Sequence, residues 1–242
     1  MPILPPDQTL SIVIPAYNEA ARIGVSLRNT LDYLDAHVPS HEVIVVDDGS
    51  SDETAEVVAG MFQGKPHLRV IRYTPNRGKG HAVRTGMLSA RGDYVVFTDA
   101  DGSTPIEEVE KLLFHLQRGA DMVMGSRGLP ESEIRQRQHI AREMMGRTFN
   151  LILRSTVMGG FKDTQCGFKG FTAEAASALF GAAQIDGFAF DVELLLLAKE
   201  RFIVKEVPVV WYNAPHSRVS PIKDSAKMLR DVARVRWKLM RR

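Results

Sequence analysis

The stretch Glu42-Val-Ile-Val-Val-Asp47, followed at once by Asp48-Gly-Ser-Ser-Asp52, decides the fold. Its first part is a short continuous apolar run, which is typical of a strand that helices cover on both faces. Its second part is a polar turn with a glycine, the kind of segment that links such a strand to the next helix. Working outward, we find similar runs at residues 11–15, 68–72 and 93–98.

Helical stretches separate these runs, at residues 19–37, 52–62 and 80–90. Repetition of strand, helix and strand predicts an α/β fold with right-handed crossovers and a mainly parallel sheet that carries helices on both faces. In such sheets ligands bind beyond the carboxyl ends of the strands. We therefore expect functional residues in the turns after the four strands, at residues 15–19, 47–52, 75–80 and 99–104.

The second half of the chain is less regular. It predicts helices at residues 105–118, 131–158 and 190–201, and strands at 121–125 and 202–211. Pro208 indicates that the last strand lies at a sheet edge, because proline cannot donate a ladder hydrogen bond. Without an internal repeat or a linker, we expect one domain over residues 1–221, with a basic amphipathic helix at 222–242.

Composition excludes several classes of protein. The 242 residues are 44% hydrophobic and 25% charged, with a net charge of +2, which argues against a disordered, collagen-like or coiled-coil chain. The single cysteine, Cys166, excludes an intrachain disulfide and a cysteine-rich zinc site. No apolar run reaches the roughly 18 residues of a membrane-spanning helix, and residues 1–10 do not resemble a signal peptide. We expect a cytoplasmic protein that is at most peripheral to a membrane.

The C-terminal segment carries a different pattern. Residues 223–242 include eight lysines and arginines. Apolar residues recur there at helical spacing and form one predicted stripe: Ile222, Ala226, Leu229, Ala233, Trp237 and Met240. Such a helix suits the cytoplasmic face of an anionic membrane, or it packs its stripe on the body of the protein, and the sequence leaves both interpretations open. The low net charge and the lack of interleaved aromatic residues argue against nucleic acid as a partner.

Asp99 and Asp101 are the strongest candidates for a metal-binding or catalytic site. They are separated by one residue and follow a predicted buried strand. Two carboxylates in that position can converge on Mg²⁺ or Mn²⁺ that also holds a diphosphate. Ser103 continues the alternation and can supply a hydroxyl ligand or hold a ligand water. The structural alternative is an acidic pair in a surface turn.

The other turns supply candidate contacts to a nucleotide. Asp47 and Asp48 end a buried strand, where a carboxylate is costly unless it is paired or used. Tyr17 can stack on a base, and Glu19 can accept from ribose hydroxyls. Lys79 lies in the glycine-rich segment Asn76-Arg-Gly-Lys-Gly80, whose backbone amides and cation can approach an anion. This segment does not have the spacing of a P-loop.

These motifs resemble those of inverting family 2 glycosyltransferases with the GT-A fold. The resemblance rests on Ile14-Pro-Ala-Tyr-Asn-Glu19, Val46-Asp-Asp-Gly-Ser50, Asn76-Arg-Gly-Lys-Gly80 and Asp99-Ala-Asp101. Within that family, later motifs resemble the dolichyl-phosphate β-glucosyltransferases and the bacterial polyprenyl-phosphate glycosyltransferases. These later motifs are Gly125-Ser-Arg127, Asp163-Thr-Gln-Cys-Gly-Phe-Lys169 and Phe190-Asp-Val-Glu-Leu194.

The resemblance implies a role for each matching residue. Pro15, Tyr17, Glu19 and Asp47 hold the base and ribose, and Asp48, Lys79 and Asp191 complete the site for the nucleotide sugar. Asp99 and Asp101 hold Mg²⁺ or Mn²⁺, with position 103 as a third ligand site; related mannosyltransferases have Gln there and this chain has Ser103. Arg127 and Arg137 bind a lipid phosphate, and Arg218 lies in a loop that closes over the donor. Asp191 has an alternative role at a helix start.

The implied reaction is transfer of a hexose, glucose from UDP-glucose in the main hypothesis, to polyprenyl or dolichyl phosphate. A phosphate monoester is already an anionic nucleophile, so the protein must mainly supply positive charge and alignment. An arginine-rich segment that includes Arg127 and Arg135 fits an anionic acceptor or forms a solvated helix face. The alternatives are another donor (GDP-mannose, UDP-GlcNAc or UDP-glucuronate), a soluble acceptor, or a nucleotide-sugar binding module without turnover.

Overall fold

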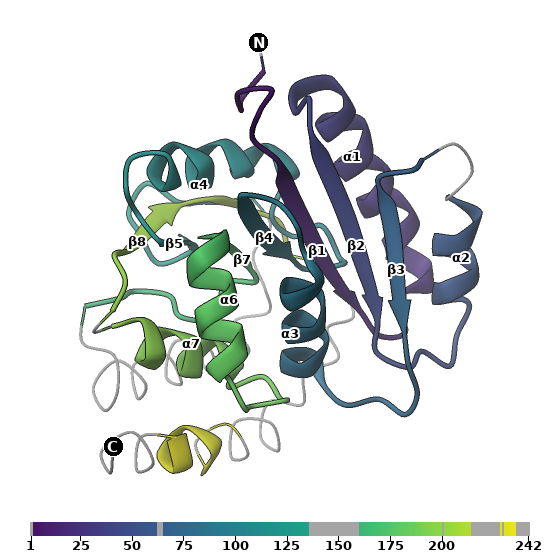
Figure 1. Cartoon of the computed structure of the whole chain (residues 1–242). Helices are drawn as coiled ribbons and strands as arrows, with labels where there is room; N and C mark the ends of the chain where they lie inside the picture. The colour runs from purple at the N-terminus through teal and green to yellow at the C-terminus, as the bar shows by residue number, and fades with distance from the viewer. Residues whose placement is uncertain are drawn as a thin grey trace.

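The computed structural model describes residues 2–61, 65–135, 160–199, 201–213, 228 and 230–235. These residues form a seven-stranded sheet with the strand order β3-β2-β1-β4-β7-β5-β8 (Figure 1). The strands are β1 (Leu10–Ala16), β2 (His41–Asp47), β3 (Leu68–Arg72), β4 (Tyr94–Thr98), β5 (Met122–Ser126), β7 (Phe168–Thr172) and β8 (Val204–Pro208). A second sheet pairs β6 (Glu133–Ile134) with β9 (Val210–Trp211) in parallel.

Helices cover both faces of the large sheet, as the sequence predicts (Figure 1). They are α1 (Ala20–His37), α2 (Thr54–Gly60), α3 (Lys79–Ser89), α4 (Val109–Leu116), α6 (Ala173–Ala182) and α7 (Phe190–Ala198). A 3-10 turn, η1 (Ile106–Glu108), precedes α4. The prediction of an α/β fold with a mainly parallel sheet is therefore confirmed.

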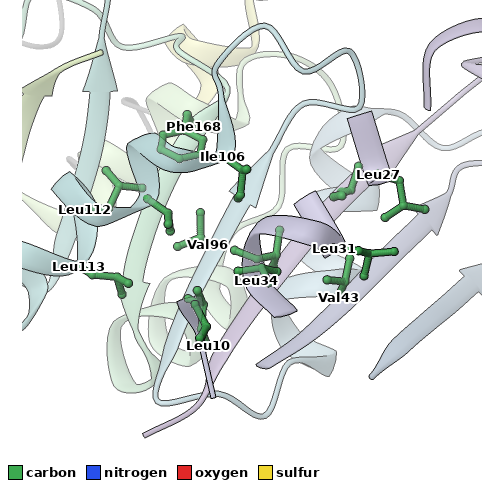
Figure 2. Close-up of a cluster of buried hydrophobic side chains, with 14 of the residues drawn as sticks. Leu10, Leu27, Leu31, Leu34, Val43, Val96, Ile106, Leu112, Leu113 and Phe168 are labelled. Carbon is green, nitrogen blue, oxygen red and sulfur yellow. The ribbon is translucent and has the colours of Figure 1, made fainter. Parts of the chain in front are cut away.

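Each strand divides its side chains between two apolar cores because successive residues point to opposite faces. In β1, Ile12 and Ile14 face the core under α1 and α4, whereas Val13 faces the core under α3 and α6. Figure 2 shows part of the first core, where Leu31 and Leu34 of α1 approach the sheet and Leu112 of α4 lies beside Phe168.

The strand register brings the functional turns to one edge of the sheet. β1 pairs in parallel with β2 and with β4, and Ala16 lies opposite Asp47. Val13 lies opposite Phe97, so β4 ends beside them and Asp99 follows at the same edge. The polar turns after these strands therefore meet in space although they are far apart in the sequence.

In the second half, two secondary-structure predictions need correction and two elements were missed. Residues 202–211 form β8 and β9 rather than one strand, although β8 does lie at the sheet edge that Pro208 indicates. The helix predicted from residue 131 does not begin there, because Glu133–Ile134 forms β6; residues 136–159 lie outside the described residues. The strand β7, which runs antiparallel to β4 and β5, and the helix α6 were not predicted.

The described part of the C-terminal segment packs on the body of the protein. Met228 and Val232 are buried in the core under α3 and α6, and Val235 packs against that core. Ala233, a member of the predicted apolar stripe, is exposed, so the buried face is rotated from the predicted one. Within the described residues, no helix has both the length and the apolar character needed to cross a bilayer.

Candidate active site

Two adjoining pockets lie at the carboxyl ends of the strands. The larger has a volume of about 420 Å³ and the smaller about 200 Å³. Their linings share five residues: Lys79, Asp99, Asp101, Phe188 and Met228. The two predicted carboxylates and the predicted lysine thus stand at the junction of the pockets, where a ligand that fills both must pass.

The Asp99 carboxylate is held on two sides. The ammonium of Lys79, in the first turn of α3, donates to Asp99 Oδ1 at 2.6 Å. On the other side, the backbone of Gly167 lies so close that a Cβ at that position would stand 2.1 Å from Asp99 Oδ2. Only glycine leaves room for the carboxylate here, so the position of Asp99 depends on the absence of a side chain at Gly167.

Asp101 and Ser103 form a compact turn after β4. The backbone N–H of Ser103 donates to Asp101 Oδ1 at 2.9 Å, and Arg22 Nη1 lies 4.0 Å from Asp101 Oδ2. The backbone oxygen of Ser103 accepts from the N–H of Tyr212 at 2.7 Å, which ties this turn to the segment after β9. Ser103 lines the smaller pocket together with both aspartates.

Lysine and aspartate side chains lie close together at the junction of the two pockets. Burial on its own lowers the pKa of Lys79, but the carboxylates of Asp99, Asp191 and Asp101 outweigh it and raise that pKa above its ordinary value. Lys79 is therefore a cation at neutral pH. Behind it, the fully buried Lys169 donates to Asp191 Oδ1 at 2.6 Å, and burial still raises the pKa of Asp191.

The wall of the larger pocket comes from the turn after β1. It includes Pro15, Tyr17 and Glu19, the three residues predicted to contact the base and ribose, together with Arg22. Tyr17 is 39% exposed, so part of its side chain is accessible to a ligand. The Glu19 carboxylate accepts from Arg22 Nε and Nη2, each at 2.8 Å, a pairing that the sequence analysis missed although residues three apart on a helix are neighbours.

The two adjacent aspartates after β2 point to different partners. Asp47 accepts from the Ser50 N–H at 2.9 Å and lies 3.1 Å from Arg72 Nε, and it is not among the residues that line the larger pocket. Asp48 does line it. Its carboxylate accepts from the backbone N–H groups of Arg77 and Gly78, both at 2.9 Å, which anchors the glycine-rich loop against the pocket.

Arg127 lines the smaller pocket and forms an ion pair with Asp163. Its Nε and Nη2 donate to the two carboxylate oxygens of Asp163 at 2.6 and 3.0 Å, and its guanidinium lies 5.5 Å from the centre of the Trp211 ring. Burial alone raises the pKa of Asp163, but Arg127 outweighs it and lowers that pKa to about 2. The same carboxylate raises the pKa of Arg127, so the guanidinium is held rigidly and stays charged at the pocket wall.

The structure brings together most of the residues predicted for the site. Asp191 lies in the first turn of α7 and also lines the smaller pocket. Glu193, two residues further along α7, accepts from the backbone N–H groups of Gln184 and Ile185 at 3.0 and 2.7 Å. Arg137 and Arg218 lie outside the described residues.

Other contributors were not singled out from the sequence. Asp163, Gly167 and Lys169 were quoted only as parts of a motif, and Phe188 and Met228 were not considered. A lysine inside the apolar run Phe168–Thr172 is an unusual strand residue, and it could have signalled a buried ion pair. Met228 carries no such signal because methionine is an ordinary core residue.

The donor set suits a hard divalent cation. Mg²⁺ and Mn²⁺ prefer carboxylate oxygens and retain waters or substrate phosphates at their other positions. Asp99 and Asp101 line both pockets, and Lys79 and the Ser103 amide each engage only one oxygen of the carboxylate that they contact. The cradle that Gly167 leaves for Asp99 is the kind of close fit that such a site requires.

The family model and two similar curated relatives agree on the family of this chain. The family model "Glycosyl transferase family 2" matches residues 11–180. The dolichyl-phosphate beta-glucosyltransferase of Dictyostelium discoideum is 35% identical over 96% of this chain and 75% of its own length. The human protein of the same name is 36% identical over 97% of this chain and 77% of its own length.

Solved structures agree on the fold. Glucosyl-3-phosphoglycerate synthase from Mycobacterium tuberculosis, in complex with Mn²⁺, UDP and phosphoglyceric acid, superposes with a TM-score of 0.68. The match covers 95% of this chain and 77% of that one, at 22% sequence identity. Another structure of that synthase, with Mg²⁺ and UDP, also superposes with a TM-score of 0.68 at 22% identity.

Proposed function

The chain belongs to glycosyl transferase family 2, and from that premise we propose that it transfers glucose from UDP-glucose to dolichyl or polyprenyl phosphate. It is a glycosyltransferase. The observation that carries the choice of reaction is the position of Asp99 and Asp101 between a pocket of about 420 Å³ and a second one that holds Arg127. A donor and an anionic acceptor can meet at that junction. Relatives named dolichyl-phosphate beta-glucosyltransferase support glucose and the lipid phosphate.

The larger pocket takes the nucleoside. Tyr17 presents the accessible part of its side chain to the base, and Glu19 and Arg22 line the same wall. Asp48 lines this pocket and holds the loop before α3, whereas Asp47 acts behind it by fixing the turn through Ser50. A nucleotide in this pocket directs its diphosphate toward Lys79 at the start of α3, where the positive end of the helix adds to the lysine charge.

The smaller pocket takes the sugar and the acceptor phosphate. Asp191 lies there to accept from sugar hydroxyls, and Lys169 fixes its orientation. Arg127, locked by Asp163, offers positive charge to the acceptor phosphate without having to reorganise. Arg137 and Arg218 are proposed to assist with the acceptor phosphate and the diphosphate, respectively.

The reaction is a single in-line displacement. An anionic oxygen of the lipid phosphate forms a bond to C1 of glucose while the bond from C1 to the UDP oxygen breaks. UDP leaves with the electron pair, and an α-linked donor becomes a β-linked product. No strong general base is needed because the nucleophile is already ionised at neutral pH. The chain's task is therefore alignment and charge stabilisation, and Lys79 and Arg127 are the cations that line the smaller pocket to supply them.

Mg²⁺ or Mn²⁺ bound by Asp99 and Asp101 would neutralise charge on the departing diphosphate. Ser103 is the proposed third position, as a direct ligand or through a water. Lys79 holds Asp99 Oδ1, which leaves Oδ2 for this purpose. The lack of a side chain at Gly167 leaves room for the Asp99 carboxylate in this position.

We also propose the cytoplasmic face of a membrane as the place of reaction, since the acceptor is a lipid. In this proposal, residues 1–221 form the GT-A domain and 222–242 form a basic helix that contacts the lipid headgroups. Arg230 and Arg234 are exposed, so their charges can face such a surface.

The test is an acceptor and donor panel. The purified protein is incubated with polyprenyl phosphate, dolichyl phosphate or 3-phosphoglycerate, each with UDP-glucose, GDP-mannose, UDP-GlcNAc or UDP-glucuronate. We expect a hexosyl lipid phosphate, identified by mass, only with UDP-glucose and a lipid phosphate, together with one UDP per product. Chelation of the divalent cation should abolish it.

Two variants make the test specific. Asp101→Asn keeps the size of the side chain and should lower turnover at least about 100-fold, as loss of one charge-stabilising group does in other enzymes. Arg28→Gln changes an exposed residue of α1 and serves as the control with unchanged turnover. Donor binding without any product in the whole panel would instead identify a nucleotide-sugar binding module. Product with 3-phosphoglycerate, and none with either lipid phosphate, would contradict the proposal that the acceptor is a lipid phosphate.

A further inference from the structure

A second cluster of potential ligands lies at the opposite end of the sheet from the active site. It comprises Asp35 in the last turn of α1, His41 at the start of β2 and His67 just before β3. Parallel strands begin at the edge opposite to their carboxyl ends, so this cluster is separated from the catalytic aspartates by the length of the strands. In Figure 1 it belongs to the upper end of α1, β2 and β3, whereas the arrowheads point downward.

The three side chains converge on one point. His41 Nε2 lies 3.4 Å from Asp35 Oδ1, and His67 Nε2 lies 3.3 Å from the same oxygen. One ligand atom from each residue falls within 4.8 Å of the others. In a tetrahedral zinc site with bonds of about 2.0–2.1 Å, neighbouring ligand atoms are about 3.3 Å apart. Two of the three separations thus already have the spacing that the metal imposes.

The hydrogen bond of His41 indicates which of its ring nitrogens can bind a metal. His41 Nδ1 lies 2.9 Å from the backbone oxygen of Val38, and because a carbonyl can only accept, Nδ1 carries the proton. Nε2 of the neutral ring is then an acceptor. A backbone carbonyl on the other ring nitrogen is also the usual partner of a histidine that binds a metal.

Burial makes the arrangement costly without a ligand. The His41 side chain is 7% exposed, and its Nε2, like that of His67, is buried and has no hydrogen-bond partner among the described residues. Buried polar atoms are seldom left unpaired, and a cation between these nitrogens and Asp35 would satisfy all three.

We propose that Asp35, His41 and His67 form a site for a divalent transition metal of the zinc class, separate from the catalytic cation. Two imidazole nitrogens and one carboxylate are a zinc ligand set, and a water completes the fourth position. Lys65 is the nearby cation that would repel a bound metal and compete with it for Asp35. The Lys65 ammonium pairs with Asp35 Oδ2, and Asp35 Oδ1 faces the histidines. Since the Lys65 side chain is 31% exposed, it can turn to solvent when the metal binds.

The site would join the end of α1 to the starts of β2 and β3, adding a direct link to the packing and strand pairing already present. Asp35 belongs to α1, which covers the sheet, while His41 and His67 lie at the starts of two adjacent strands. A metal there clamps the helix to the strands, and it stabilises the folded state because the unfolded chain holds no preformed site.

Cobalt(II) alone is the probe, in the Asp101→Asn protein so that the catalytic site does not contribute. A four-coordinate Co²⁺ ion with nitrogen ligands gives intense visible bands, whereas an octahedral ion with oxygen ligands gives weak ones. We expect one such intense signal per chain, displaced by equimolar Zn²⁺. Asp35→Asn and His67→Gln should each weaken the Co²⁺ affinity at least about 100-fold, since they remove a ligand outright.

The controls separate the site from other histidines and from a loss of fold. His115→Ala removes a histidine of α4 and should leave the signal unchanged. Lys65→Met removes the opposing cation and should tighten Co²⁺ binding about tenfold. Zn²⁺ should raise the melting temperature of the wild-type protein but not that of Asp35→Asn. Absence of the intense bands, or equal Co²⁺ affinity in Asp35→Asn and in its parent, would overturn the proposal.

Discussion

At the scale of single residues, Gly167 decides the position of a carboxylate that the chemistry depends on. An alanine Cβ there would stand 2.1 Å from Asp99 Oδ2, so Gly167→Ala must displace Asp99, the backbone of residue 167, or both. A displacement of about 1 Å in a catalytic group can cost about 100-fold in rate. We expect a loss of that size in turnover with Mg²⁺ or Mn²⁺, measured as UDP release.

A second glycine provides the matched control. Gly181 lies on the exposed side of α6, and a Cβ there meets nothing within 4 Å. Gly181→Ala should keep full turnover and stabilise the protein by about 0.5–1 kcal/mol, because alanine loses less conformational entropy in a helix. Full turnover in Gly167→Ala would show that Asp99 does not need its present position.

The buried pair of Arg127 and Asp163 predicts a dependence of stability on pH. The pKa of Asp163 is about 2 in the folded protein and about 3.9 in an unfolded chain. A lowered carboxyl pKa stabilises the folded state above the unfolded value, and this contribution is lost as pH falls through the folded value. We expect protonation of Asp163 to remove on the order of 2–3 kcal/mol of stability between about pH 5 and pH 1.

Urea unfolding at a series of pH values measures this contribution. Asp163→Asn should abolish the part of the slope that comes from this group, and the variant should be less stable at pH 7, because the buried guanidinium of Arg127 then lacks its counter-charge. An identical pH slope in both proteins would contradict the assignment.

At the scale of elements, the C-terminal segment links the core to the site. Met228 is 6% exposed, belongs to the core under α3 and α6, and lines both pockets. Met228→Ala should therefore destabilise the protein by about 2–5 kcal/mol and also weaken UDP binding, because one wall of the pocket recedes. Chemical denaturation and calorimetric titration with UDP check the two effects. Arg234→Ala, at an exposed position of the same segment, should change neither by much.

Helices and strands that are determined by the local sequence pattern could be predicted. Those that depend on pairing with segments distant in the sequence could not. The strands ending at Asp47 and Thr98 have continuous apolar runs and polar turns, so their place and the functional edge follow from pattern alone. β7 contains Lys169 and Gly170, which break an apolar run, and it is a strand because β4 and β5 pair with it on both sides. Such pairing is a tertiary effect that no local window contains.

The same distinction holds for the site. Asp99 and Asp101 are easy to recognise in the sequence. Two carboxylates directly after a buried strand are energetically costly unless they bind a partner, so they indicate a functional site. Their supports do not stand out: the Lys79 contact to Asp99 and the Asp163 contact to Arg127 each join segments far apart in the sequence. Sequence therefore predicts which groups react more readily than what holds them in place.

At the scale of the whole molecule, the burial of Met228 and Val232 limits how the chain can meet a membrane. Apolar residues that pack on the body are unavailable for insertion into lipid, so the described part of the C-terminal segment can contribute only its charges. Attraction of exposed arginines to anionic lipids is electrostatic and is screened by salt, unlike insertion of an apolar face. The two modes of contact therefore differ in a measurable way.

We predict that the protein binds anionic vesicles and that binding falls steeply as salt is raised. Each arginine near the surface contributes about 1 kcal/mol, so replacing Arg230 and Arg234 together by Gln should weaken binding to phosphatidylserine vesicles about 30-fold in a sedimentation assay. Arg28→Gln with Arg91→Gln changes two exposed arginines elsewhere and should have a much smaller effect. If both double variants bind like the wild type, or if binding is insensitive to salt, the membrane contact does not come from this segment's charges. Another surface would then have to bring the protein to its lipid acceptor.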